Sequence, residues 1–470
     1  MTTWLIQKLE ELKPGDEPRD GYALGTMVDQ IGARAGMVSG MVLSNNYDRD
    51  KVVARGAEIM AMWVPQLSAH TLRMYSEVAQ RQHLALDVSA YLATADARDA
   101  ELAAAEEAKR VASVAAFEEE RARIFAGEAN PALEAALADD TPQAFDVYAD
   151  WLESKGMARG ELIHLMLRNE GHRTSAGYEA IEEFIEEHAD ELLGEVPDEE
   201  VATLEWRRGF IDALTLDSDE DFDSALERIL CHPSARRLRS LTVGMNGESA
   251  AEQSSFVNTL IKWHPDHLRT LFIGSFDGEI SWYQVGDVSA IWQGLPSLRE
   301  VTIRGGAFEL GEIQAPALES LTLQTGGLTS ANVASVADAA WPNLKYLDLY
   351  FGEHSYGDTE LDDVRTLLEN KFPALRHLGI ANCPFVDQAV GLIAESPLAA
   401  QLEELNVSLG CFGEEGAAIL LGDAFPKLKK IDISRSFVGE EQLTQLRARY
   451  EVVATDMNSP DEDRYVSISE

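Results

Sequence analysis

From residue 211 onward the chain repeats one short pattern: an apolar residue, two variable residues, an apolar residue, one variable residue and a last apolar residue. The nine copies are IDALTL, LRSLTV, LRTLFI, LREVTI, LESLTL, LKYLDL, LRHLGI, LEELNV and LKKIDI. They start about 27 residues apart on average, within the range of known solenoid periods. One such unit cannot bury its own apolar side chains, so neighbouring units must stack to form a common core.

This pattern resembles the leucine-rich repeat. The segments between copies, such as 363–375 and 413–428, carry Leu and Ile at helical spacing. Repeats of this length with full helices resemble the ribonuclease-inhibitor subtype. The resemblance implies an α/β solenoid with parallel strands on a concave face and helices on a convex face. The interval between the copies at 298 and 318 is the shortest, so we expect an irregular convex segment there in place of a helix.

Upstream of the repeats, the segment 136–170 predicts two helices folded back on each other. Thr141 and Pro142 suit a helix start, and Gly156 suits a helix end. The two helices would share an apolar side made of Phe145, Tyr148, Leu152, Leu162, Leu165 and Met166. We expect this hairpin to cover the exposed apolar end of the first repeat, chiefly with Phe145, Trp151 and Leu165.

The same segment resembles the bacterial repeat-companion domain, a short module found beside leucine-rich repeats. The matching residues are Tyr148, Ala149, Asp150, Trp151, Leu152, Gly156, Arg159, Gly160, Glu161 and Ile163. The family usually has Asp-Pro after the glycine, where this chain has Met157 and Ala158. The segment 206–216 is similar to the stretch that links such hairpins to their repeats. The resemblance implies repeats downstream and no enzyme activity.

The predicted organisation has five parts. Residues 1–90 are expected to form a small helical domain, 91–129 a long helix rich in Ala, Glu and Arg, 130–205 the hairpin with an acidic linker helix, 206–450 the repeats, and 451–470 an acidic disordered tail. A spacer helix is favoured over a dimerising coiled coil for 91–129, because its apolar positions are mostly Ala. The N-terminal region is therefore predicted to be all-α.

The charge balance limits the partners that suit this chain. Asp and Glu total 81 against 39 Lys and Arg, a net charge of -42. Such a field repels nucleic acid and anionic membranes, and it favours partners with a basic surface. Solubility alone is an equally good explanation of the charge.

Cysteine usage favours a reducing compartment. Cys231, Cys383 and Cys411 are odd in number and far apart in sequence, which argues against a disulfide framework. The N-terminal residues lack the apolar stretch of a secretory signal. No run reaches the roughly 18 apolar residues that a membrane-spanning helix needs. We therefore expect a cytoplasmic protein that does not contact membranes.

Sequence motifs for catalysis or for cofactor binding are missing. The chain has no G-x-x-x-x-G-K-[ST] loop, no G-x-G-x-x-G turn, no H-E-x-x-H and no C-x-x-C pair. An EF-hand alignment over 217–230 puts Phe222 where Gly is needed and Arg228 where the bidentate Glu belongs. Cys231 and His232 are adjacent and are expected to end a helix. We therefore expect no cofactor, no metal and no catalytic residue.

The variable positions of the pattern are the candidate binding residues, because they alternate with the core residues and face the other side of the sheet. The predicted concave face carries Phe272, Glu300, Thr302, Arg304, Tyr346, Asp348, Tyr350, His377, Glu404, Asn406 and Asp432. Tyr346 and Tyr350 flank Asp348 on one strand, and exposed aromatic residues there suggest a binding hot spot. The alternative is ordinary packing between neighbouring strands.

Three hypotheses about function follow from these features. The favoured one is a non-catalytic interaction protein whose concave face binds a protein partner with a basic surface. A second is a sensor and effector, in which residues 1–130 carry an enzymatic, toxic or oligomerising activity that the repeats control. A third is self-association through the N-terminal helices.

Overall fold

The computed structural model describes residues 92–98, 130–194, 202–218, 222–245, 255–274 and 283–468, and the single positions 100, 101, 104, 119, 123 and 280. The chain divides into two compact units, Met1–Glu118 and Glu119–Glu470. The domain predicted at 1–90 lies outside the described residues. The described residues from 92 to 123 are helical, and the boundaries of the helix predicted over 91–129 stay a prediction.

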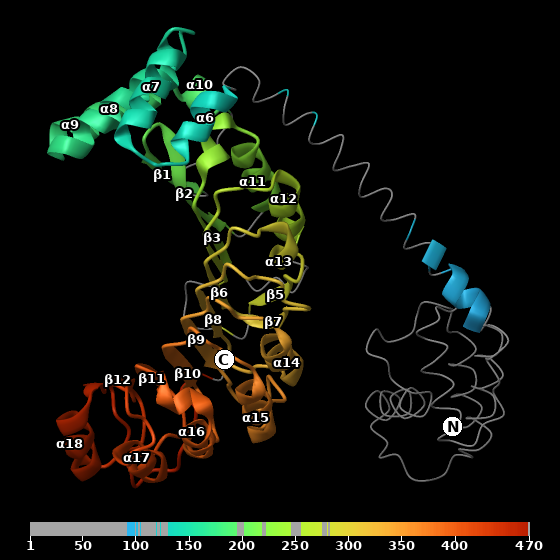
Figure 1. The fold of residues 1–470 in the computed structure, drawn as a ribbon, viewed down its shortest axis with the longest axis vertical. Helices are drawn as coiled ribbons and strands as arrows, with labels where there is room; N and C mark the ends of the chain where they lie inside the picture. Colours follow the sequence, from blue (N-terminus) through green and yellow to red (C-terminus); the bar gives the residue numbers. More distant parts are fainter. Residues whose placement is uncertain are drawn as a thin grey trace, which may run out of the picture. The chain divides into compact units, whose positions relative to one another are not determined.

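An eleven-stranded sheet runs through the second unit (Figure 1). Its strands, in spatial order, are β1 Ala202–Arg207, β2 Phe210–Ser218, β3 Ser240–Met245, β4 Thr270–Gly274, β6 Glu300–Arg304, β8 Ser320–Gln324, β9 Tyr346–Tyr350, β10 His377–Ala381, β11 Glu404–Asn406, β12 Lys430–Asp432 and β13 Glu451–Val453. β1 and β2 are antiparallel, and every neighbouring pair from β2 to β13 is parallel. Each recurring pattern contains one of the strands β2 to β12. The predicted α/β solenoid is confirmed.

Helices connect successive strands and cover one face of the sheet (Figure 1). They are α11 Phe222–Leu230, α12 Ser255–Trp263, α13 Ile291–Gly294, α14 Ser330–Asp338, α15 Leu361–Glu369, α16 Val386–Glu395, α17 Glu414–Leu421 and α18 Glu440–Arg449, with the 3-10 helices η3 Pro233–Arg237 and η5 Pro397–Ala400. Across the described residues, no helix combines the length and apolar character that crossing a membrane requires.

Two neighbouring repeats depart from this plan. Their outer segments are β5 Gln284–Asp287 and β7 Gly306–Glu309, which form a separate two-stranded parallel sheet. Trp292 of the short helix α13 donates its indole N–H to the carbonyl oxygen of Leu310 at 2.7 Å and ties the two repeats together. As the short interval predicted, the convex segment between β6 and β8 contains no helix.

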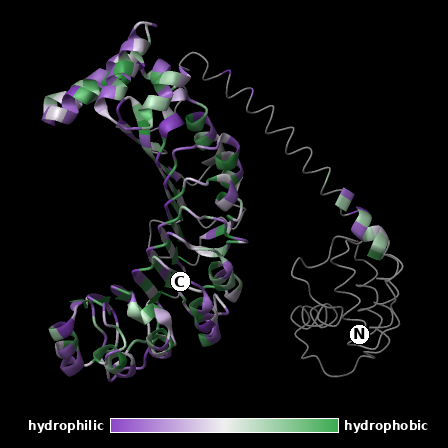
Figure 2. Ribbon diagram, in the orientation of Figure 1, coloured by the Kyte–Doolittle hydropathy of each residue, from purple (hydrophilic) through white to green (hydrophobic). Residues whose placement is uncertain are grey.

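Columns of apolar side chains hold the strands and helices together. The ladder registers align Leu241, Leu271, Val301, Leu321, Leu347, Leu378, Leu405 and Ile431 across eight strands, and each is at most 1% exposed. Figure 2 shows apolar and polar residues alternating along the elements of the arc. Burying such a side chain fully contributes about 1.5–3 kcal/mol, provided that neighbouring repeats cover it on both sides.

The predicted hairpin is present at the start of the repeats. Its helices are α7 Pro142–Glu153 and α8 Ala158–His172, and α6 Pro131–Leu137, α9 Ser175–Glu187 and α10 Ala189–Leu192 complete this cap. The Thr141 hydroxyl accepts a hydrogen bond from the Ala144 N–H, and Gly156 after α7 has a φ of 75°. The first helix therefore begins and ends as predicted.

The hairpin covers the end of the sheet through two apolar clusters. Phe145 and Tyr148 of α7 are buried against Phe210 of β2, and Trp151 packs at the edge of this first cluster. Leu165 packs instead against the second cluster, which contains Leu162, Met166, Ile181 and Leu192. Of the three predicted cover residues, only Phe145 therefore lies at the centre of the contact with β2.

The repeat boundary predicted at residue 206 falls inside a strand. β1 turns through Arg208 and Gly209 into β2, and both turn residues have positive φ, 48° and 78°. Arg159 of α8 is 1% exposed and donates to the carbonyl oxygen of Gly209 and to Ser234 Oγ, both at 2.8 Å. The antiparallel β1–β2 hairpin thus closes the sheet, and a buried arginine holds its turn.

The tail predicted to be disordered is ordered as far as Ile468. Its first residues form β13, and the chain then runs back across earlier repeats. Ser467 N donates to Leu409 O at 2.7 Å, and the backbone of Ile468 exchanges two hydrogen bonds with the Asn382 side chain, at 2.6 and 3.0 Å. The prediction was wrong because acidic composition says nothing about hydrogen bonds that only the folded repeats provide.

Arg464 anchors this tail. Its Nη1 donates to Asp387 Oδ2 at 2.7 Å and to Cys411 O at 3.2 Å, and Asp387 is only 6% exposed. A Cβ at Gly413 would stand 2.3 Å from the Arg464 guanidinium, so the glycine provides the space for it. The tail therefore supplies the positive charge that a buried carboxylate of the repeats needs.

We predict that Arg464→Ala lowers the free energy of unfolding by about 1–3 kcal/mol, because Asp387 loses the partner of its buried charge. Urea denaturation of the full chain followed by circular dichroism measures the loss. Arg435→Ala is the matched control: its guanidinium lies 3.9 Å from Asp456, whose side chain is 78% exposed. This control should change stability by less than about 0.5 kcal/mol, and an equal loss in both variants would contradict the assignment.

Candidate functional site

The ladder registers bring the predicted concave residues into three rows. The first row is Thr270, Glu300, Ser320, Tyr346, His377, Glu404 and Lys430, and the second is Phe272, Thr302, Thr322, Asp348, Gly379, Asn406 and Asp432. The third is in two parts, Gly274 with Arg304 and Gln324, and Tyr350 with Ala381. These rows alternate with the apolar columns and so lie on the other face of the sheet, which we call the inner face.

Five predicted residues from β9, β10 and β11 contact one another on the inner face. The rings of Tyr346 and His377 are stacked, with centroids 3.8 Å apart and planes 12° apart. His377 Nδ1 lies 3.2 Å from Glu404 Oε2. His377 Nε2 is buried and has no hydrogen-bond partner among the described residues. Asp348 and Asn406 complete this set, which we call the inner-face cluster.

Asp348 is the buried centre of the cluster. It is 4% exposed and accepts hydrogen bonds from Asn406 Nδ2 at 3.1 and 3.2 Å and from the Tyr346 hydroxyl at 3.3 Å. Gly379 lies between Asp348 and Asn406 in the ladder, and a Cβ there would stand 1.6 Å from Asp348 Oδ1. For Asp348 and Asn406, packing between strands therefore describes the structure better than an exposed binding site.

Burial sets the ionisation of this region. It raises the pKa of Asp348 above its ordinary value, against the opposing effects of His377 and of the Asn406 hydrogen bond. Burial and the nearby Asp348 carboxyl also raise the pKa of Tyr346, and they raise the pKa of Tyr350 to about 12. Both tyrosines therefore keep their protons at neutral pH and can donate hydrogen bonds.

A cavity of about 220 Å³ opens beside the cluster, between β9 and β13. Its lining residues are Tyr346, His377, Glu404, Leu405, Asn406, Lys430, Asp432 and Val453. The sequence reasoning missed Lys430 and Val453. Lys430 stands at a variable position of the last pattern and could have been found there, whereas Val453 belongs to a strand that carries no copy of the pattern.

The remaining predicted residues lie apart from this cavity. Phe272 is on β4, and Glu300 is exposed on β6. Arg304 on β6 donates to Gln324 Oε1 on the neighbouring strand β8 at 2.9 Å. The predicted set is therefore divided into a group on β4 and β6 and a group on β9 to β12.

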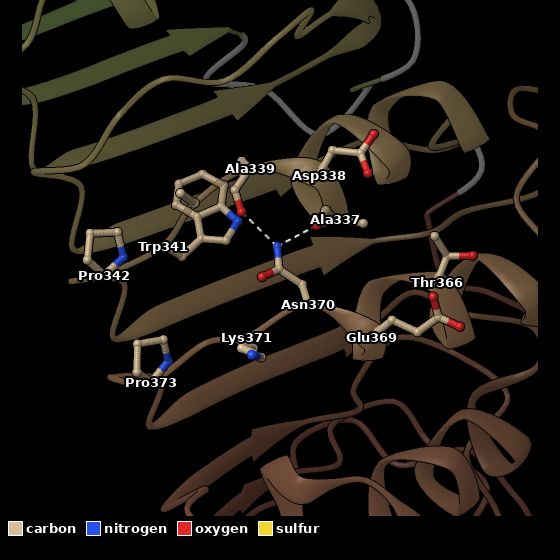
Figure 3. Close-up of a pocket in the computed structure, with 11 residues that line it drawn as sticks. Ala337, Asp338, Ala339, Trp341, Pro342, Thr366, Glu369, Asn370, Lys371 and Pro373 are labelled. Atoms are coloured by element: carbon tan, nitrogen blue, oxygen red, sulfur yellow. Dashed lines mark hydrogen bonds between the residues drawn. The ribbon is translucent and has the colours of Figure 1, made fainter.

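A larger cavity, of about 700 Å³, lies between the ends of α14 and α15 (Figure 3). The Asn370 amide crosses it and donates to the carbonyl oxygens of Ala337 and Ala339, the latter at 2.8 Å. Trp341 donates its indole N–H to Val336 O at 2.8 Å. These polar groups satisfy the carbonyls at the end of α14, so this cavity is a structural joint between two helices.

Another cavity, of about 950 Å³, lies in the cap between α8, α9 and β1. Arg208 and Glu170 line it and form an ion pair, with Arg208 Nε 2.8 Å from Glu170 Oε1. Arg208 also donates to the carbonyl oxygen of Asp140 at 2.7 Å. Arg208 and Glu170 of this cavity therefore hold α8 against the β1–β2 turn.

The cysteines lie in surroundings that favour the thiol form. Burial raises the pKa of Cys231, Cys383 and Cys411, and Cys383 is fully buried. A raised pKa lowers the fraction of thiolate, which is the nucleophilic form. Over the part of the chain that the structure describes, no group of three or more His, Cys, Asp or Glu residues could hold a metal ion.

Comparison with known proteins supports the repeat fold. No protein-family model matches the chain. Ribonuclease inhibitor from Sus scrofa is 26% identical over 201 residues, which cover 40% of this chain and 43% of that protein. The match spans less than half the length of that inhibitor, and its extent says nothing about residues outside the match.

One of the similar solved structures agrees with this fold. A crystal structure of a protein from Bacteroides fragilis is 25% identical, with a TM-score of 0.50, and the match covers 63% of this chain and 87% of that one. An internalin from Listeria monocytogenes is 13% identical, with a TM-score of 0.26, and the match covers 53% of this chain and 86% of that one. At that score the likeness to the internalin is too weak to bear on the fold.

We predict that Gly379→Ala lowers the free energy of unfolding by about 1–3 kcal/mol, because the new methyl group would overlap Asp348. In an Asp348→Ala background the loss should shrink, since the two sites are in contact. Gly391→Ala is the matched control, because its Cβ would meet nothing nearer than Ile419 Cδ1 at 3.7 Å. Equal losses at both glycines in urea denaturation would show that the Asp348 contact is not the cause.

Asp348 also predicts a dependence of stability on pH. Folding raises the pKa of Asp348, so between the two pKa values the folded chain keeps a proton that the unfolded chain has lost. The free energy of unfolding therefore falls as the pH rises from the ordinary pKa of 3.8 through the raised pKa. Asp348→Asn removes this loss of unfolding free energy, because the asparagine side chain does not ionise. The variant should therefore gain stability relative to the wild type across that window, and the gain should stay constant above it. Urea denaturation of both proteins over a pH series tests this, and a pH-independent difference would contradict it.

Proposed function

We propose that this protein binds another protein through the inner face of its last repeats and performs no chemistry on it. The observation that carries the proposal is the cavity between β9 and β13, which the stacked rings of Tyr346 and His377 line together with Glu404 and Asp432. Aromatic and charged side chains gathered in one recess are typical of protein-binding hot spots. The recess is small, so it suits a side chain of a partner protein rather than a large ligand.

The charges of the recess support a partner with a basic surface. The Glu404 side chain is 46% exposed, and Asp432 is half-buried on β12, beside the edge strand β13. Both can accept charge-assisted hydrogen bonds from Lys or Arg, and only Lys430 opposes them among the lining residues. The net charge of -42 would also accelerate association with a basic protein.

The likeness to ribonuclease inhibitor supports the same class of function. The name of that protein describes inhibition of an enzyme, which is an action on another protein. We further propose that residues 130–194 are a repeat-companion module whose role here is to cap the first repeat. Their packing against Phe210 supports this, because it covers apolar surface that the first repeat would otherwise expose. The hypotheses of an effector or a self-associating region in 1–130 stay predictions.

The test is a charge reversal in the recess. A partner captured from the native host and identified is titrated against the wild type and against Glu404→Lys with Asp432→Lys, by isothermal calorimetry at two salt concentrations. We expect the double variant to bind at least about tenfold more weakly, because two favourable charge pairs become repulsive. The wild-type affinity should also fall with added salt.

The matched control is Glu369→Lys with Glu395→Lys, which makes the same change in net charge near the ends of α15 and α16 on the helical side. Both glutamates are exposed, so the variant should fold normally. An equal loss of affinity in both double variants would mean that net charge alone drives binding. Unchanged affinity of the recess variant would remove the inner-face assignment.

A further inference from the structure

In the eleven-stranded sheet, the residue immediately before each strand from β3 to β12 is charged, and most of these residues are bases. Arg239, Arg269 and Arg299 stand immediately before β3, β4 and β6. Backbone hydrogen bonds of 2.8 Å join them in a ladder, from Arg269 N to Arg239 O and from Arg299 N to Arg269 O. We call this edge of the sheet the strand-entry rim. Lys345, Arg376 and Lys429 continue it before β9, β10 and β12.

A carboxylate on the rim bridges two bases at the middle of the sheet. Glu319 stands immediately before β8, between Arg299 and Lys345 in the ladder. Its carboxylate lies 2.7 Å from Arg299 Nη1 and also bonds to Lys345 Nζ. The hydrogen bond from Lys345, followed by that from Arg299, lowers the pKa of Glu319. One acid thus neutralises the base on each side of it.

The same arrangement recurs at both ends of the rim. Glu403, before β11, lies 3.7 Å from Arg376 Nε and 2.6 Å from Lys429 Nζ. Asp212, at the equivalent position on β2, accepts a hydrogen bond from Arg239 Nε at 2.6 Å. Every rim base named so far, except Arg269, therefore has a carboxylate partner on the rim itself.

Arg269 is the exception. Its side chain is exposed, and within the described residues it makes no ion pair and no side-chain hydrogen bond. Its neighbours on the rim are both arginines, Arg239 and Arg299. Burial, followed by the charge of Arg237, lowers the pKa of the nearby His267; Arg269 and Arg239 add to this lowering, and the charge of Asp266 opposes it. Among the described residues, Arg269 therefore has no carboxylate partner of the kind that Glu319 provides for Arg299 and Lys345.

We propose that the rim at Arg269, between Arg239 and Arg299, is a binding site for an acidic segment of a partner protein. A carboxylate of that segment would pair with Arg269, as Glu319 pairs with Arg299 and Lys345. Neighbouring strands are about 4.8 Å apart, so further carboxylates of one extended segment would lie beside Arg239 and Arg299, which already have Asp212 and Glu319 as partners. The planar guanidinium can bind a carboxylate through two parallel hydrogen bonds. This site lies on different repeats from the recess, and it does not depend on the proposed function.

The net charge of the chain favours a short protein segment over a nucleic acid. At physiological ionic strength the Debye length is about 8 Å, so a short acidic segment on the rim is screened from most of the distant carboxylates. A nucleic acid extends well beyond three strands and would meet the acidic surface of a chain whose net charge is -42. The site therefore suits a few carboxylates held close together.

The experiment measures binding of fluorescein-labelled octaglutamate to the full chain by fluorescence anisotropy, at an ionic strength of about 0.15 M. We expect saturable binding by the wild type with a Kd below about 1 mM, and Arg269→Ala should weaken it at least about fivefold. Arg269→Glu should abolish it. Since Arg269 has no partner to lose among the described residues, Arg269→Ala should change the free energy of unfolding by less than about 0.5 kcal/mol.

The matched control is Arg376→Ala, which removes a base from the same position of a later repeat where Glu403 already neutralises it. It should change octaglutamate binding less than twofold, or about 0.4 kcal/mol. Equal weakening by both substitutions would overturn the proposal, because binding would then follow net charge. Absence of binding by the wild type up to about 1 mM would overturn it as well. The reversal of Glu404 and Asp432 should leave this binding undiminished, which separates a failure here from a failure of the proposed function.

Discussion

Each repeat of this protein depends on its neighbours, because the apolar side chains of one unit can be covered only by the units before and after it. The column that includes Leu241, Leu347 and Ile431 is at most 1% exposed in strand after strand. This mutual burial forces short strands into one continuous parallel sheet. The stack also has two ends whose apolar side chains need covering, and a different segment of the chain covers each end. The helical cap buries Phe210 at one end, and the ordered tail crosses the last repeats at the other.

Parallel stacking also decides where polar groups meet. Residues at equivalent positions of successive repeats lie side by side, so like charges would repel unless the chain alternates their sign or gives one of them another partner. On the strand-entry rim, Glu319 and Glu403 are placed between bases. On the inner face, the carboxylate of Asp348 lies over Gly379 of the next strand and accepts a hydrogen bond from Asn406 of the strand after it. The surfaces of this protein are therefore consequences of the same repetition that builds its core.

The candidate site follows from this geometry. Short strands leave an inner face of isolated polar and aromatic side chains, whose spacing is set by the ladder and whose exposure varies from strand to strand. Tyr346 and His377 stack because they are neighbours in register, and the adjoining recess exists where the strands shorten towards β13. Such a surface offers recognition by shape and charge. The thiols, whose pKa values are raised by burial, add no activated nucleophile to it.

The sequence by itself determined the repeats, their parallel strands, the helical hairpin before them and the rows of candidate residues on the inner face, because these depend on local periodicity that a linear pattern records. It misjudged the tail and did not indicate β1 or β13, since those segments carry no copy of the pattern and are held by partners distant in sequence, such as Asp387 for Arg464. Only the tertiary structure decided that Asp348 is buried while the Glu404 side chain is 46% exposed, and that Arg269 has no acidic partner among the described residues. Equivalent positions of a repeat look alike in sequence, and their burial and pairing depend on which side chains stand beside them in the stacked sheet.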